Sequence, residues 1–96
     1  KKYNEMDDEA REVIEDMHYN MSPQSIDKFK GFNKAIMEDD YSRAADELRY
    51  SNADKKDQET PYYKQTKDRA KDHVERLKRA AQRKAIGDQM KYNLER

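Results

Sequence analysis

The sequence contains no cysteine, and its 96 residues include only two glycines and two prolines. Without cysteine, the chain can form no disulfide, no thiolate metal site and no cysteine nucleophile. The two isolated glycines, Gly31 and Gly87, cannot build a phosphate-binding loop, a dinucleotide-binding fingerprint or a nucleophile elbow, because these motifs need clustered glycines. Composition therefore excludes most nucleotide-binding and hydrolase classes.

Long apolar runs are also missing. No segment approaches the roughly 20 apolar residues of a membrane-spanning helix, and no secretion signal opens the chain, so we expect no membrane partner. Hydrophobic residues make up only 33% of the chain and charged residues 44%. The zero net charge and the regular spacing of the apolar residues nevertheless argue against disorder. We expect one domain, residues 1–96, with a small core.

The zero net charge conceals an asymmetry, because residues 1–50 carry a net charge of −5 and residues 51–96 a net charge of +5. We expect these two halves to attract one another across their solvated faces. A nucleic-acid site would instead place basic residues among aromatic ones, with few acids nearby. The basic run 76–84 follows Asp68, Asp72 and Glu75 on the same predicted helix, so we expect no nucleic-acid partner.

The first segment with helical periodicity is Met6–Met21, where apolar residues recur at three- and four-residue steps. Its other faces are charged, so neighbouring helices must cover the apolar stripe. We therefore expect an all-α fold, a small bundle of four to five helices around this central amphipathic helix. The stripe consists of Met6, Ala10, Val13, Ile14, Met17 and Met21.

Further helices follow from cap and proline signals. Ser22-Pro23 predicts the start of a second helix that extends to Ile36, and Asp40 caps a third helix over residues 41–49. Thr60-Pro61 predicts a single helical turn, after which Thr66 caps the last long helix. The predicted buried stripe of that last helix consists of Ala70, Val74, Leu77, Ala81 and Ala85.

Two segments lie outside this helical pattern. Residues 51–60 have no periodicity and little to bury, so they are expected to form a mobile surface loop. Gly87 is expected to end the long helix, which would leave residues 87–96 as a short terminal helix or as a tail able to dock on another chain.

Candidate catalytic and metal-binding groups are sparse. His18 and His73 fall on different helices without a His-Glu-x-x-His pattern, so both are expected to be solvated or capping, and no metal or cofactor is predicted. Carboxylates are abundant, but none has the apolar setting that a catalytic acid requires. Glu15, Asp46 and Glu47 are expected to be surface charges, and no catalytic residue is assigned.

Three stretches resemble the C-terminal lobe of the phage-type lysozymes, the small muramidases that cut peptidoglycan strands. Residues 17–22, Met-His-Tyr-Asn-Met-Ser, are similar to the end of that family's buried central helix. Residues 29–36 together with 40–48 resemble the following segment, including a small helix with an Ala-Ala pair. Residues 63–70, Tyr-Lys-Gln-Thr-Lys-Asp-Arg-Ala, are similar to the aromatic-x-Gln-Thr-x-x-Arg-Ala segment before the last helix.

The match covers about residues 10 to 80 and implies a lysozyme-like C-terminal lobe, in which Tyr19, Asn20 and Met21 face the sugar- and peptide-binding groove. It implies no catalytic residue, because the family's catalytic glutamate and its Asp and Thr helpers belong to an N-terminal lobe that this chain lacks. Ser22 also replaces the turn glycine of the family.

We therefore expect the C-terminal lobe of a phage lysozyme-like peptidoglycan hydrolase, which engages the cell wall while a catalytic lobe comes from upstream residues or another chain. The alternative is a non-catalytic structural or interaction module of a virion tail, baseplate or internal head protein. Expected partners are peptidoglycan or the missing catalytic lobe, and other virion proteins. The expected location is the virion, or the host cell wall or periplasm during infection.

Overall fold

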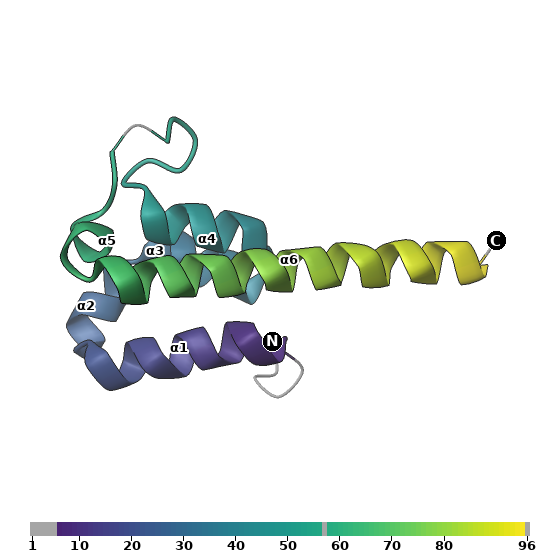
Figure 1. Ribbon diagram of the computed structural model, residues 1–96, viewed down its shortest axis with the longest axis horizontal. Helices are drawn as coiled ribbons and strands as arrows, with labels where there is room; N and C mark the ends of the chain where they lie inside the picture. The colour runs from purple at the N-terminus through teal and green to yellow at the C-terminus, as the bar shows by residue number, and fades with distance from the viewer. Residues whose placement is uncertain (1–5, 57, 96) are drawn as a thin grey trace.

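The computed structural model describes residues 6–56 and 58–95, with side chains up to residue 90. In these ranges the chain is helical and contains no strand, which confirms the all-α class (Figure 1). None of the described helices is both long and apolar enough to cross a membrane. The helices are α1 (Asp8–Asn20), α2 (Pro23–Asp27), α3 (Lys30–Met37), α4 (Tyr41–Arg49), α5 (Pro61–Gln65) and α6 (Lys67–Glu95).

Side-chain caps start four of these helices. The oxygen of each capping side chain accepts backbone N–H groups of the first turn, which otherwise lack a partner. The caps predicted from sequence at Ser22, Asp40 and Thr60 are confirmed, and Asp7 caps α1 in the same way. Sequence alone thus located the starts of α2, α4 and α5.

The predicted second helix is divided in two. Phe29 leaves helical geometry with φ −85° and ψ 60°, so α2 ends before it and α3 begins after it. The break turns the Phe29 ring toward Phe32 and Tyr62, with ring centroids 6.4 and 5.9 Å apart. Aromatic packing at this point outweighs helical continuity, which a periodicity of apolar residues cannot reveal.

The predicted break at Gly87 is wrong, because α6 continues through this residue to Glu95. A glycine inside a helix costs only about 1 kcal/mol relative to alanine, and good helix formers lie on both sides. Nothing lies within 4 Å of the position that a Gly87 side chain would occupy. Residues 87–95 are therefore the end of a helix that projects beyond the body of the molecule (Figure 1).

Helix α6 lies in the middle of the structure, with α1 along one side and α4 along the other (Figure 1). Helix α3 packs on α4, and α5 leads into the start of α6. The predicted stripe of α1 enters the core, whereas the stripe of α6 is shifted: His73 and Ala80 are buried and Ala85 is exposed. The largest fully buried side chains are Met17, Leu48, Leu77 and Val13.

The described residues between 51 and 60 form a loop whose two ends lie together at the end of α4. An antiparallel bridge joins Tyr50 to Glu59, and the Ala53 side chain is buried. Arg43 of α4 binds the Asp54 carboxylate at 2.6 Å. These contacts hold the described part of the loop against α4, while its mobility stays a prediction.

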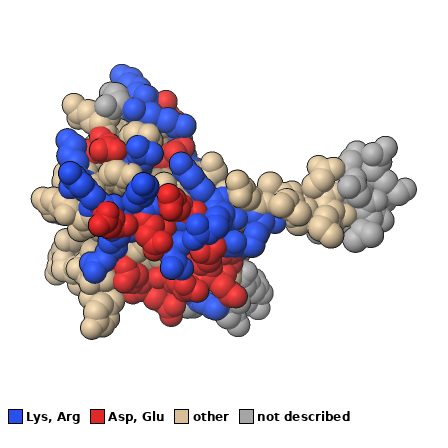
Figure 2. Space-filling model, viewed as in Figure 1, with Lys and Arg blue, Asp and Glu red and all other residues tan. Residues whose placement is uncertain are grey.

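The acidic half meets the basic half along the contact between α1 and α6 (Figure 2). The Arg83 and Arg79 guanidinium groups bind the Asp7 and Glu9 carboxylates at 2.8 and 2.7 Å. One turn further on, Arg76 binds Glu12 at 2.7 Å. The attraction predicted from the charge asymmetry is confirmed. The hydrogen bond from Arg79 lowers the pKa of Glu9 from its ordinary 4.5 to about 2.

We predict that Leu77→Ala lowers the free energy of unfolding by about 3 kcal/mol, because it leaves a cavity among α1, α4 and α6. Ile86→Ala is the matched control on the same helix, since Ile86 is exposed beyond the core, and it should change stability by less than about 0.5 kcal/mol. Urea unfolding followed by circular dichroism measures both. Equal losses in the two variants would contradict this packing of α6.

A second prediction concerns acid. Because the pKa of Glu9 is lower in the folded chain than its ordinary 4.5, ionised Glu9 stabilises the fold above pH 4.5, and this contribution disappears between about pH 4.5 and 2. Glu9→Gln should therefore reduce the drop in unfolding free energy over that range. Glu15→Gln, on the exposed side of α1, should leave the drop unchanged. An unaltered acid profile for Glu9→Gln would refute the role of this ion pair.

Candidate functional site

A groove of about 700 Å³ opens where the end of α1, the α2–α3 junction, the end of α4 and the α5 turn come together. Its volume lies in the range of small-ligand sites, about 300–1,000 Å³. Each wall comes from an element end, where the chain changes direction and leaves side chains unburied. The lining includes Asn20, Met21, Phe29, Gly31, Glu47, Tyr50, Tyr62, Gln65, Thr66 and Arg69.

The structure places two of the three site residues proposed from sequence in the groove and the third outside it. Asn20 and Met21 line the groove, whereas Tyr19 does not and is 89% exposed. Tyr19 follows the buried Met17 by two residues, which is a rotation of about 200° around the helix. It therefore points away from the core and from the groove.

Helix α5 supplies the groove residues that the sequence did not indicate. Tyr62, Gln65 and Thr66 all line the cavity. The Thr60-Pro61 signal located this turn, but one helical turn contains too few residues for a periodic pattern to show which side faces inward. Phe29 is only half-buried and forms an edge contact with the Tyr62 ring at the groove wall.

The groove combines ring surfaces and small uncharged polar groups with the basic side chains of Lys28, Lys30 and Arg69 and the carboxylate of Glu47. Phe29, Tyr50 and Tyr62 contribute the rings, which can pack against the C–H faces of a ligand. Asn20 and Gln65 contribute amides, and hydroxyl groups come from Ser22, Ser25 and Thr66. Such a lining suits a ligand with apolar faces and many hydroxyl or amide groups.

Glu47 is the single carboxylate among the residues that line the groove. Its Oε1 atom accepts hydrogen bonds from Nε and Nη2 of Arg43, both at 2.8 Å. The carboxylate also touches the backbone of α3 at Gly31, where any larger residue would collide with it. Glycoside hydrolysis requires two carboxyl groups on opposite sides of the scissile bond. The residues that line the groove supply one such group, and it is ion-paired with Arg43.

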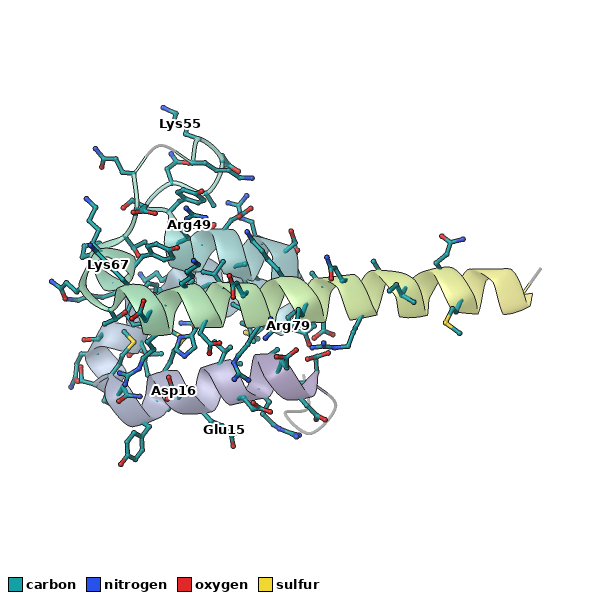
Figure 3. The ribbon with its side chains drawn as sticks, in the orientation of Figure 1. Glu15, Asp16, Arg49, Lys55, Lys67 and Arg79 are labelled. Atoms are coloured by element: carbon teal, nitrogen blue, oxygen red, sulfur yellow. The ribbon has the colours of Figure 1, made fainter. Side chains whose placement is uncertain are left out.

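Behind the groove, a chain of hydrogen bonds links three helices. His73 of α6 is 3% exposed; its Nε2 atom lies 2.7 Å from Oδ2 of Asp16 on α1, and its Nδ1 atom lies 2.8 Å from the Tyr62 hydroxyl on α5. Figure 3 shows Asp16 at the contact of α1 with α6. The prediction that His73 is solvated or capping is wrong, because its stripe position buries the ring.

Burial sets the ionisation of this chain of groups. Desolvation lowers the pKa of His73, an effect that the Asp16 carboxylate partly offsets, and desolvation raises the pKa of Tyr62 to about 12. A tyrosine with a raised pKa is not an activated nucleophile.

His18 differs from His73. Its ring is exposed, as the sequence predicted, and its Nδ1 atom lies 2.9 Å from the Ile14 carbonyl oxygen. Among the described residues, no group of three or more His, Asp or Glu side chains could hold a metal ion.

We predict that Tyr62→Phe lowers the free energy of unfolding by about 1–2 kcal/mol, because the buried Nδ1 atom of His73 loses its partner. Tyr63→Phe is the matched control, since the Tyr63 ring packs on Arg49 and its hydroxyl has no hydrogen bond among the described residues. It should change stability by less than about 0.5 kcal/mol. Thermal or urea unfolding of both variants tests the difference, and identical stabilities would contradict the hydrogen bond.

The chain matches no protein-family model, no curated protein and no solved structure. The resemblance to the phage-type lysozymes therefore depends on the three stretches of sequence that carry it. The lining of the groove is the independent basis for assigning a ligand.

Proposed function

We propose that this chain is a non-catalytic binding lobe that engages the glycan strands of peptidoglycan through the groove between α1, α3, α4 and α5. The observation that supports the proposal is the lining, in which aromatic rings, amides and hydroxyl groups lie beside one ion-paired carboxylate and the basic side chains of Lys28, Lys30 and Arg69. N-acetylated sugars offer complementary groups, because each ring has an apolar face and carries hydroxyl and amide substituents. The lysozyme-like motifs point to the same ligand.

In this proposal the chain acts as the C-terminal lobe of a phage lysozyme-like hydrolase. It would hold the strand while a catalytic lobe, from another part of the protein or another chain, cuts it. Under this proposal the chain would act in the virion, or in the host cell wall or periplasm. The groove lining itself contributes one carboxylate, so any cleavage needs carboxyl groups from outside the groove.

The projecting end of α6 supports a second candidate, a structural module of a virion that docks on another protein. Ile86 and Met90 are each 59% exposed on this end. Under this alternative the groove has no saccharide ligand. Binding of purified peptidoglycan by the chain would therefore decide between the two functions.

The deciding experiment is co-sedimentation with purified peptidoglycan, supported by titration with a neutral trisaccharide of N-acetylglucosamine. Gln65→Ala removes an amide from the groove wall and should weaken binding about fivefold, the effect of one lost hydrogen bond. Gln24→Ala removes a side-chain amide of the same kind from an exposed position of α2 outside the groove, and it should have no effect on binding.

Tyr19→Ala is a second control, because the exposed Tyr19 ring lies outside the groove. Loss of binding in this variant but not in Gln65→Ala would move the site away from the groove. No binding by the unmodified chain would reject the proposal and favour the structural module.

A further inference from the structure

The imidazole of His73 connects the groove to a second, separate surface. On one side its Nδ1 atom contacts the hydroxyl of Tyr62, which lines the groove. On the other side its Nε2 atom contacts Asp16, which lies in a shallow cleft between α1 and α6 and is 41% exposed. The ring itself is almost completely buried, so these two contacts determine which of its nitrogens carries the proton.

The positions of the protons follow from the chemistry of the partners. An ionised carboxylate can only accept hydrogen bonds, so Nε2 of the neutral ring must carry the hydrogen and donate it to Asp16. Nδ1 is then a lone pair and must accept the hydrogen of the Tyr62 hydroxyl. The rings of Tyr62 and His73 lie only 11° from parallel. With its hydrogen directed at His73, the Tyr62 oxygen has only lone pairs left for its other neighbours, which include the Thr66 side chain at the groove wall.

We infer that Asp16, acting through His73, fixes Tyr62 as a hydrogen-bond acceptor toward the groove, so that the groove selects a ligand with a hydroxyl or amide N–H at this point. The inference rests on the proposed function and specifies how the groove recognises a saccharide. Tyr62 is the residue that contacts the ligand, and Asp16 and His73 are positioning residues. A ligand that presents only an ether oxygen or a carboxylate there is disfavoured.

Asn20 makes this arrangement testable by one substitution. Its Nδ2 atom donates to Oδ1 of Asp16 at 3.0 Å, and the other carboxylate oxygen, Oδ2, faces His73. In Asp16→Asn, Asn20 holds the new amide oxygen at the Oδ1 position, which places the NH₂ group opposite Nε2. His73 must then accept at Nε2 and donate from Nδ1, and the Tyr62 hydroxyl turns its hydrogen toward the groove. The polarity of Tyr62 is thereby reversed.

Other charged groups near His73 do not take over the role of Asp16 in fixing the tautomer of the imidazole. From α1, Glu12 lines the same cleft as Asp16; from α6 itself, Arg69, Asp72 and Arg76 line it. Asp72 and Glu12 are paired with Arg76, and Arg69 lies 3.7 Å from Asp16. Asp72→Asn is therefore the matched control, because it removes the same charge from the same cleft without touching the imidazole.

The test measures the tautomer and the affinity separately. In a His18→Gln background, His73 is the one remaining histidine, and its ¹⁵N chemical shifts report which nitrogen is protonated. We expect the Nε2–H form in the parent and in Asp72→Asn, and the Nδ1–H form in Asp16→Asn. Affinity for the neutral N-acetylglucosamine trisaccharide should fall about fivefold in Asp16→Asn alone.

The outcomes separate failure of this inference from failure of the proposed function. A tautomer that does not change in Asp16→Asn, or one that changes without any loss of affinity, overturns this inference while the proposed function stands. Failure of the parent chain to bind any saccharide overturns the proposed function and the inference with it. If Asp16→Asn does not fold, Tyr62→Phe replaces it, since removal of the acceptor must also weaken binding about fivefold. Unchanged affinity in that variant overturns the inference.

Discussion

The contact between α1 and α6 is the constraint on which the rest of this structure depends. The chain is 44% charged and 33% hydrophobic, so its core is small and must be completed by bringing the acidic and the basic half together. The paired side chains are 17–55% exposed, and such pairs contribute about 1 kcal/mol or less each. Burial of Val13, Met17 and Leu77 supplies more than that, so the core holds the helices together and the ion pairs fix their register.

The sequence predicted those features of the fold that arise from local interactions. Caps at Ser22, Asp40 and Thr60 and the stripe of α1 are all encoded within a few residues. The break at Phe29 and the continuation through Gly87 are different, because they depend on packing or on its absence. A periodic pattern shows which residues can be buried, but it cannot show how far a helix extends beyond the partners that bury it.

The residues of the candidate site were harder to predict from the sequence, because their contacts also depend on how the helices pack. Asn20 and Met21 were proposed from the resemblance at residues 17–22, whereas Asp16 and His73 are 57 residues apart and meet only after α1 has packed on α6. One signal was nevertheless present. His73 follows Ala70 by three residues and precedes Leu77 by four, which places the imidazole on the buried stripe of the last helix. A buried histidine in that position requires a hydrogen-bond partner for each ring nitrogen, and Tyr62 and Asp16 are those partners.

Among the described residues, the buried side chains of His73 and Thr60 lie at the groove end of this small protein. Toward the projecting end of α6, the core among α1, α4 and α6 is built from alanine, leucine and tyrosine, and at the groove it contains an imidazole held by a carboxylate and a hydroxyl. A leucine at position 73 would fill similar space without any hydrogen-bond requirement, and a partly satisfied polar network is worse than an apolar core. Among the described residues, no buried side-chain nitrogen or oxygen lacks a partner, so the network is complete. Complete hydrogen bonding fixes the direction of each proton, and the Tyr62 hydroxyl is the point at which that direction reaches the groove. Under the proposed function, stability and recognition share one set of atoms, and a substitution that moves a proton without removing a side chain is the kind of change that separates them.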